Sequence, residues 1–530
     1  MEPKTAQSHV VSDHEADAVL YEKGATAEDA DDMRRMGKTQ ETRRTFRSVT
    51  ILGFCMVMLS TWEVVLATSV FALSNGGTAG LIWGYLIVMV GFGFVVASLA
   101  EMASMAPTAG GQYHWVSEFA PPTCQKFLSY MVGWLGVLGW QTGAATVSYL
   151  AGKQIQGLIK LNNPSYELKA WHGTMLIWFV LVICLVFNTF FSKKLALVEG
   201  VIVILHIAGF FAVLIPLWVL GDTSQSSGVF TRFEDNMGWG NLPLAVIIGL
   251  TGASGTFVGV EAGAHMSEEV RNAAYVIPRA MMWTWFGNGL LGWVMAITFC
   301  YCLGDTMSVL TTELGTPFIQ VFLNATGSAG GATALTVIML VIAIFACVAI
   351  MATNSRQLFA FARDNGVPFS KTFSYVSPTL EVPVNSTYMT LLFVVILSLI
   401  NLGSTVAFMQ VISLGVAAML TTYLISISCI TLKRLRGEPL LPSKFDLGRF
   451  GLAINLIAVA FLIFFWVFCF FPVGPNPTVV DMNWACLGYG IVIIFALVYY
   501  AVRGRHVYLG PVAVVTRTTR SRADMYPATD

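Results

Sequence analysis

Three ionisable side chains lie deep inside long apolar runs of this sequence: Glu63, His206 and Glu261. A charged group at membrane depth is energetically expensive, so a carboxylate there is by default a functional group. Histidine titrates near neutral pH and is a common proton carrier, although it also serves as a hydrogen-bonded structural residue, and both roles stay open for His206. These residue types predict a site that binds a polar solute or handles protons, provided that the apolar runs cross a membrane.

The composition places those runs in a membrane. Of 530 residues, 56% are hydrophobic and 11% are charged, with a mean hydropathy of +0.70, whereas soluble domains carry about 25% charged residues. The net charge is zero, the nine cysteines show no metal-ligand spacing with histidine, and the sequence contains no GxxxxGK[ST] phosphate loop. We therefore expect an all-α polytopic membrane protein, and we expect neither an enzyme, a metal site, an ATP-driven pump nor a nucleic-acid binder.

Twelve apolar segments are long enough, or nearly so, to cross a bilayer. They lie near residues 48–73, 79–104, 124–152, 168–191, 195–220, 242–266, 281–304, 332–360, 384–402, 405–432, 451–471 and 484–502. Polar segments flank them, and we interpret residues 1–47 as a disordered cytoplasmic tail and residues 503–530 as a second cytoplasmic tail. Three lysines of the first tail, Lys4, Lys23 and Lys38, are candidate ubiquitination sites for endocytic control.

The distribution of lysine and arginine orients the chain. With both termini in the cytoplasm, only four of the 30 Lys and Arg residues fall outside: Lys153, Lys160, Lys169 and Arg232. The same orientation places Asn324, in the sequon Asn-Ala-Thr, in an outside loop. Asn324 is therefore the expected glycosylation site.

The sixth segment is poorly built as a helix. "GLTGASGTFVGVEAGAHMSEE" (249–269) contains five glycines together with Glu261 and His265, and glycine costs about 1 kcal/mol relative to alanine inside a helix. One interpretation is close packing of helices through small residues. The other is a helix broken at a binding site, which transporters with inverted repeats place at the same position of each half, five spans apart.

The matching segment five spans earlier is the first one. "MLSTWEVVLATSVFALSNGG" (58–77) carries Glu63 near its middle, beside Thr61 and Trp62. No glycine marks a break there, but a carboxylate at that depth needs a partner or a cavity. Segments one and six are therefore the predicted pair of interrupted helices.

Three stretches of the chain resemble a known family. "SLAEMASMAPTAGGQYHWVSEFAPP" (98–122) is similar to the signature loop of amino acid–polyamine–organocation (APC) transporters, and "TWEVVL" (61–66) and "GVEAGAHMSEEVRNAAYVIPRAM" (259–281) resemble their fungal amino acid/choline branch, which includes GABA and choline permeases. The resemblance covers about residues 43–505. It implies a LeuT-like fold of 12 transmembrane helices, in which spans 1–10 (48–432) form a 5+5 inverted-repeat transporter core with helices 1 and 6 broken, and spans 11 and 12 (451–502) are accessory.

The resemblance also implies where a substrate binds. Carried over by position, the substrate-binding residues are Thr61, Trp62, Glu63, Ser254, Gly255, Thr256, Phe257, Val258 and Gly259, with Phe257 as an aromatic lid. Glu261 stands where some relatives have an acid implicated in proton sensing. His206 stands where many relatives have a lysine thought to exchange the coupling proton, which favours a coupling role for His206 over a structural one.

Glu63 departs from the small residues that relatives binding zwitterionic amino acids often have. An acid beside Trp62 suits an ammonium or quaternary ammonium group, through ionic and cation–π contact. We expect a permease for a small nitrogenous solute such as an amino acid, GABA or choline. It would be driven by a proton gradient without a cofactor and would lie in the plasma membrane, or alternatively in the vacuolar membrane. An exporter of a nitrogenous secondary metabolite and an amino-acid-sensing transceptor are the alternatives.

Overall fold

The computed structural model describes residues 23–512 apart from 225, 404 and 480, and the side chains of residues 405–409 are also outside the description. Within that range the chain is helical, with two isolated β-bridges, Phe46 to Val270 and Asn75 to Asp235. The helices that correspond to the twelve expected spans are α3 with α4 (Ser48–Leu59 and Thr61–Ser74), α5 (Gly77–Met105), α7 (Gln125–Asn162), α8 (Ala170–Thr189), α9 (Leu195–Leu220), α10 with α11 (Leu242–Ser254 and Ala262–His265), α12 (Ala273–Tyr301), α15 (Ala329–Arg363), α17 (Val384–Ser398), α19 (Thr405–Leu435), α20 (Gly451–Phe468) and α21 (Ala485–Tyr499).

Nine helices of the described chain are long and apolar enough to cross a membrane by length and composition. The short α10 and the long α7 and α12 make up the other three expected spans. The prediction of an all-helical polytopic membrane protein is therefore confirmed. Its boundaries erred most at α7, which continues about three turns beyond the predicted end at residue 152.

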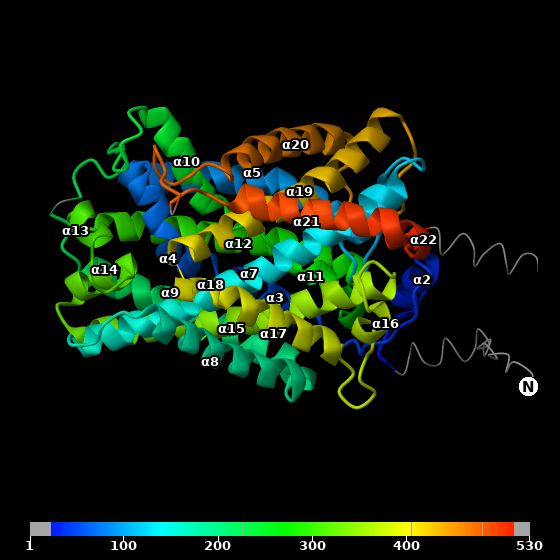
Figure 1. The fold of residues 1–530 in the computed structure, drawn as a ribbon, viewed down its shortest axis with the longest axis horizontal. Coiled ribbons are helices and arrows are strands. Elements are labelled where there is room, and N and C mark those ends of the chain that lie inside the picture. Colours follow the sequence, from blue (N-terminus) through cyan, green and yellow to red (C-terminus); the bar gives the residue numbers. More distant parts are fainter. Residues whose placement is uncertain (1–22, 225, 404, 480, 513–530) are drawn as a thin grey trace, which may run out of the picture.

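The long helices run side by side, and shorter ones lie at the two ends of the bundle (Figure 1). One end, here named the α2 end, carries α2 (Ala27–Arg35), α16 (Ser370–Phe373) and α22 (Arg505–Val507). The opposite end, the α14 end, carries α13 (Thr306–Leu310) and α14 (Pro317–Thr326). The remaining short helices are α6 (Gln112–Phe119) and α18 (Ile400–Gly403).

Helix α9 shows how a membrane protein distributes its polar groups. The exposed side chains recur at helical spacing and are all apolar: Leu197, Val201, Ile204, Ile207, Phe211, Ile215 and Trp218. The buried face instead carries Glu199 and His206. This distribution suits a helix whose outer face meets lipid and whose ionisable groups turn towards the protein interior.

The first span is interrupted at a single residue. Ser60 adopts the left-handed conformation (φ 38°, ψ 52°) and separates α3 from α4. A left-handed residue other than glycine costs about 1–2 kcal/mol, so packing around it must hold it in place. Its hydroxyl donates a hydrogen bond to the carbonyl of Val57. The expected break in span one is confirmed, although no glycine marks it.

The sixth span is interrupted over seven residues. Helix α10 ends at Ser254, the chain turns through residues 255–261, and α11 resumes at Ala262. Gly259 has a φ of 97°, which few other residues adopt, whereas a Cβ on Gly249 would lie 1.9 Å from the carbonyl oxygen of Asn75. The glycines therefore serve both of the roles considered for them, since Gly249 permits close packing of α10 on the end of α4 and Gly259 permits the break.

Candidate functional site

A cavity of about 130 Å³ lies between the two interrupted helices. Cavities of about 150 Å³ hold a molecule the size of benzene, so the space suits a small solute. The lining residues come from both broken spans and from α7, α15 and α19: Met58, Leu59, Val64, Thr68, Phe71, Gly139, Gly143, Thr146, Val147, Leu150, Thr251, Gly252, Gly255, Val258, Ile350, Ile412, Gly415, Val416 and Met419. The lining is apolar apart from three threonines and the peptide backbone, and it includes no charged side chain among the described residues.

A second cavity, of about 80 Å³, lies next to the first on the side of the α14 end. Its lining includes Asn75 at the end of α4, residues 471–473 and Asp481. Phe71 and Thr251 line both cavities, so these two side chains stand between them. Phe71 thus lies as a lid over the first cavity, here named the inner cavity, on the side that faces the second one.

Of the nine predicted substrate-binding residues, two line the inner cavity and seven do not. Gly255 and Val258 line the inner cavity. Phe257 packs on α5 instead, with its ring centroid 5.7 Å from that of Phe92. The other predicted residues, Thr61, Trp62, Glu63, Ser254, Thr256 and Gly259, are buried or half-buried beside the cavity rather than in its lining.

Thr68, Phe71, Thr146 and Thr251 were not among the predicted site residues, although they line the cavity. Thr68 and Phe71 lie one and two turns after Val64, another lining residue, on the same face of α4. This helical spacing could have predicted that Thr68 and Phe71 line the same cavity as Val64. Nothing local marks Thr146, because α7 is brought to the cavity only by packing.

Glu63 points at His206. Its Oε1 lies 2.8 Å from the Nδ1 of His206, and both side chains are buried. The other ring nitrogen, Nε2, lies 3.2 Å from the Oδ1 of Asn288, whose Nδ2 donates to the carbonyl of Met56. Since Asn288 already uses its amide as a donor there, its oxygen accepts the Nε2–H of His206, and the tautomer is fixed.

This arrangement leaves one mobile proton between Glu63 and His206. With that proton present the pair is neutral, either as carboxylate and imidazolium or as carboxylic acid and imidazole. Loss of the proton leaves a net charge of −1 in a buried position. The pair can therefore switch between two charge states beside the break at Ser60.

Glu261 makes a different contact. Its Oε2 accepts a hydrogen bond from the hydroxyl of Tyr423 in α19, and the same hydroxyl accepts the backbone N–H of Gly259 at 2.9 Å. Tyr423 thus connects the break in span six to α19. The structure does not place Glu261 in the contact that His206 and Glu63 share.

His265 has the contacts of a structural residue. The indole N–H of Trp140 donates to its Nε2 at 3.1 Å, which leaves the proton on Nδ1 for the carbonyl of Ala109 at 2.8 Å. Both ring nitrogens of the neutral form are satisfied. His265 therefore connects α7, the loop before α6 and the sixth span.

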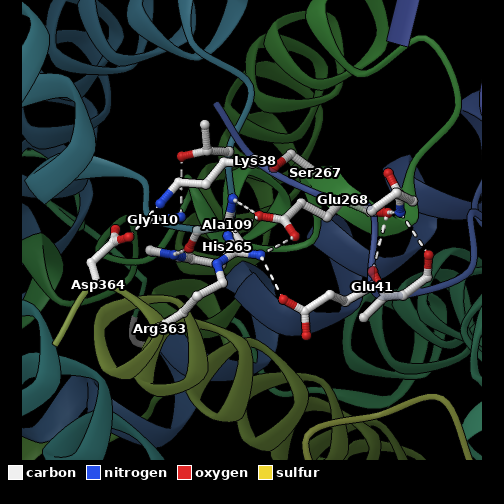
Figure 2. A network of polar contacts seen from close by, with 12 residues as sticks. Lys38, Glu41, Ala109, Gly110, His265, Ser267, Glu268, Arg363 and Asp364 are labelled. Carbon is white, nitrogen blue, oxygen red and sulfur yellow. Dashed lines mark hydrogen bonds and ion pairs between the residues drawn. The ribbon is translucent and has the colours of Figure 1, made fainter. Parts of the chain in front are cut away.

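Around His265, at the α2 end, lies a cluster of buried ion pairs, here named the seal (Figure 2). Arg363 at the end of α15 donates both Nη groups to Glu268, at 2.9 and 2.6 Å, and Lys38 pairs with Asp364. Arg356 donates its Nε to Glu269 at 2.8 Å. The two arginine pairs join α15 to the segment that follows span six, and the Lys38 pair joins the end of α15 to the N-terminal segment.

The N-terminal segment is part of this seal. Residues 1–22 lie outside the described range, but residues 23–47 pack on the bundle, which corrects the interpretation of the whole of 1–47 as disordered. The carboxylate of Asp29 accepts the backbone N–H groups of Asn272 and Ala273 at 3.0 and 3.2 Å, where α12 begins, and pairs with Arg44. Phe46 exchanges backbone hydrogen bonds with Glu269 and Arg271.

Of the three candidate ubiquitination sites, Lys4 lies outside the described residues. Lys23 donates to the carbonyls of Gln40 and Glu41, and Lys38 is held by Asp364. Modification of Lys23 or Lys38 would therefore require this segment to detach.

The fold and the cavity define a class of protein. Twelve spans, with the first and sixth broken around a small cavity that is sealed at one end, are the architecture of a secondary transporter. The chain matches the family model for amino acid permeases over residues 45–494. It belongs to that family, and it is a transporter rather than an enzyme.

Relatives agree with this assignment. A Macrophomina phaseolina protein named for amino acid/polyamine transport is 32% identical over 82% of this chain and 96% of its own length. The choline transporter of Saccharomyces cerevisiae is 27% identical over 94% of this chain and 89% of its own length. Amino-acid permease 2 of Neurospora crassa is 27% identical over 92% of this chain and 90% of its own length.

Proposed function

We propose that this protein imports a small zwitterionic nitrogenous solute, such as an amino acid or GABA, together with a proton. The observation that carries the proposal is the buried Glu63–His206 pair directly beside the broken helix that lines the cavity. The α2 end would face the cytoplasm, because the lysines and arginines gather there, and the membrane would be the plasma membrane.

Since the cavity lining includes no charged side chain among the described residues, the charges of a bound solute would have to be stabilised by backbone N–H and C=O groups. The first turn of α4, at Thr61 and Trp62, presents amide groups that have no partner within the helix, and the positive end of the helix dipole favours a carboxylate there. The end of α10 at Ser254 offers carbonyl oxygens for an amine. Thr61, Trp62 and Ser254 would thus act through their main chains, and Gly255 and Val258 through the cavity wall.

A choline-like cation is the second candidate. The similarity to a choline transporter favours it, and Trp62 with Glu63 could hold a quaternary ammonium. However, Glu63 faces His206 in this structure, so it would have to leave that contact to bind the cation. The zwitterion requires no such rearrangement.

A thermal-shift screen of the purified protein against amino acids, GABA, polyamines and choline would identify the solute. Counterflow of the labelled solute in liposomes then distinguishes a transporter from a transceptor, which would bind without exchange. An imposed pH gradient tests the coupling and its direction. A rate of net uptake that changes with neither the pH gradient nor the membrane potential would rule out proton coupling.

The cavity volume predicts a size limit that Gly255→Ala should sharpen. The added methyl would meet only ordinary contacts, 3.5 Å to the Gly252 carbonyl and 3.8 Å to Val416, so the fold should tolerate it. Because the methyl enters the cavity wall, transport of the largest accepted solute should fall by about 10- to 200-fold in kcat/KM, with little effect on the smallest. Gly490→Ala is the matched control, since nothing lies within 4 Å of a Cβ there. Equal effects of G255A on large and small solutes would contradict the location of the site.

Asn324 remains the proposed glycosylation site. It is exposed near the C-terminal end of α14, on the end of the bundle opposite the seal. Protein from a eukaryotic host should shift to higher mobility on endoglycosidase treatment, and Asn324→Gln should remove the shift. A shift that persists in N324Q would argue for another site or for the reverse orientation.

A further inference from the structure

Glu199 is a buried acid that the proposed site does not use. It lies on α9, one turn from the start of that helix at Leu195 next to the α2 end. Its side chain is 0% exposed, and neither carboxyl oxygen has a hydrogen-bond partner among the described residues. By contrast, Glu63, Glu261 and Glu268 each have at least one.

No cation faces Glu199 from the elements packed on α9, which are α3, α12, α14, α15 and the turn at Ser192–Lys194. Helices α3 and α14 contain no charged residue. Four of the basic side chains in the others bind elsewhere, since Arg356 and Arg363 pair with Glu269 and Glu268, Arg279 donates to the carbonyl of Tyr275, and Lys193 pairs with Glu381. The fifth, Lys194, is exposed, whereas Glu199 is buried. The remaining titratable side chains of these elements are Cys55, Tyr275, Cys300, Tyr301 and Cys347. An unpaired buried carboxylate is too costly to persist, so Glu199 holds its proton in this state.

Glu199 and His206 lie on one face of α9. They are seven residues apart, which is two helical turns or about 10 Å along the axis, and Ile202 is buried on the same face between them. Helix α3 packs closely on α9 at this position, because a Cβ on Gly53 would come within 3.3 Å of the backbone carbonyl oxygen of Glu199. Since α3 is one half of a broken span, its movement would uncover Glu199 towards the α2 end.

We propose that Glu199 is the group that releases the coupling proton on the α2 side. This inference rests on the proposed function, in which the Glu63–His206 pair carries the proton. When α3 moves away, Glu199 gives its proton to water and becomes a carboxylate. It then receives the proton of the His206 imidazolium through intervening water, which leaves a neutral imidazole beside the Glu63 carboxylate. Chains of acidic residues and histidine mark proton paths in membrane proteins.

Glu199→Gln tests this role, because glutamine has nearly the same shape and cannot release a proton. Reconstituted protein would be assayed with radiolabelled L-alanine, GABA and choline and with a pH-sensitive dye inside the liposomes. Uptake driven by a pH gradient should fall about 100-fold, the usual size of a proton-transfer contribution. Counterflow can proceed without deprotonation of the Glu63–His206 pair, so its rate in E199Q should stay within about twofold of the wild-type rate.

Two variants keep the result interpretable. Gly200→Ala changes the same α3–α9 interface without a titratable group, and its Cβ would meet only Thr50 at 3.7 Å, so coupling should be unchanged. E199D keeps a carboxyl group but places it on a shorter side chain, so uptake should persist at a lower rate with a shifted pH profile. If E199Q does not fold, the result for E199D decides whether Glu199 has this role. Wild-type coupling in E199Q, or a wild-type rate and pH profile in E199D, would overturn the role of Glu199 alone. Wild-type protein that moves no protons would overturn the proposed function itself.

Discussion

His206→Ala is expected to reduce uptake driven by a pH gradient by about 100-fold, the scale of a lost proton-transfer group. The variant leaves Glu63 buried without the ring nitrogen that lies 2.8 Å from it. An unpaired carboxylate there would stay protonated, so the charge switch beside the broken helix would be lost. A buried carboxyl group that loses its hydrogen-bond partner also costs about 1–3 kcal/mol, so the melting temperature should fall.

Glu63→Gln tests proton coupling without removing the buried contact to His206. The glutamine amide can donate to the Nδ1 of His206 and thereby keep the contact, but the pair can no longer reach a net charge of −1. Solute binding in a thermal-shift assay and counterflow should persist, while the response of uptake to external pH should disappear. His265→Ala is the control, because this second buried histidine makes structural contacts to Trp140 and Ala109. H265A should lower stability and leave the pH response intact. A pH response that survives in both E63Q and H206A would remove the pair from the mechanism.

Arg363→Ala is expected to open the α2 end. Arg363 makes a bidentate contact to Glu268, and the two side chains are 14% and 3% exposed. Leaving Glu268 without this partner costs about 3–5 kcal/mol, which corresponds to about a 150- to 5,000-fold shift towards states in which the seal is broken. Cys55, which is buried on α3 against Gly263, should then become reactive towards a polar thiol reagent, measured peptide by peptide by mass spectrometry.

Arg436→Ala removes the same charge from the same end of the bundle and serves as the control. Within the described part of the chain Arg436 pairs with Glu438, and both side chains are about half exposed, at 49% and 48%. Surface pairs of this kind contribute about 1 kcal/mol or less, so Cys55 should stay protected. Protection of Cys55 in R363A would mean that the seal does not hold the α2 end closed.

Two ion pairs of the seal, Arg363–Glu268 and Lys38–Asp364, should not respond to pH in the physiological range. Burial alone would raise the pKa of the Glu268 carboxyl, but the Arg363 guanidinium outweighs it and holds that pKa below its ordinary value. Burial opposes Lys38 and Arg363 in the same way at Asp364, whose pKa is also lowered. Carboxyls with lowered pKa values stabilise the folded state above their ordinary range, near pH 4, and lose that contribution only as the pH falls through the lowered values. Any pH dependence of transport between pH 5 and 8 is therefore not expected from the Glu268 and Asp364 pairs, and the Glu63–His206 pair is its proposed source.

Sequence alone determined the membrane class, the order of the spans and the two spans that are broken. The spans and the break in span six are local features, because a run of apolar residues must become a helix to satisfy its backbone in lipid, and a glycine cluster weakens that helix wherever it lies. The break in span one has no glycine to mark it and was predicted from the five-span repeat and the buried Glu63. It also identified Glu63, His206 and Glu261 as functional candidates, since an ionisable group at membrane depth is costly whatever its neighbours are.

Only the tertiary structure decided which way those side chains face. Glu63 and His206 are 143 residues apart in the chain, and their contact depends on how α4 and α9 are rotated about their own axes. The rotation of α4 also leaves Phe71 between the two cavities, and packing of the break in span six places Phe257 on α5. Hydropathy specifies that a helix crosses the membrane, but its rotation is set by packing against helices distant in sequence. For the same reason residues 23–47 have the composition of a tail and yet form part of the seal, because the partners that order them, Glu268, Asn272 and Asp364, lie more than 200 residues further along the chain.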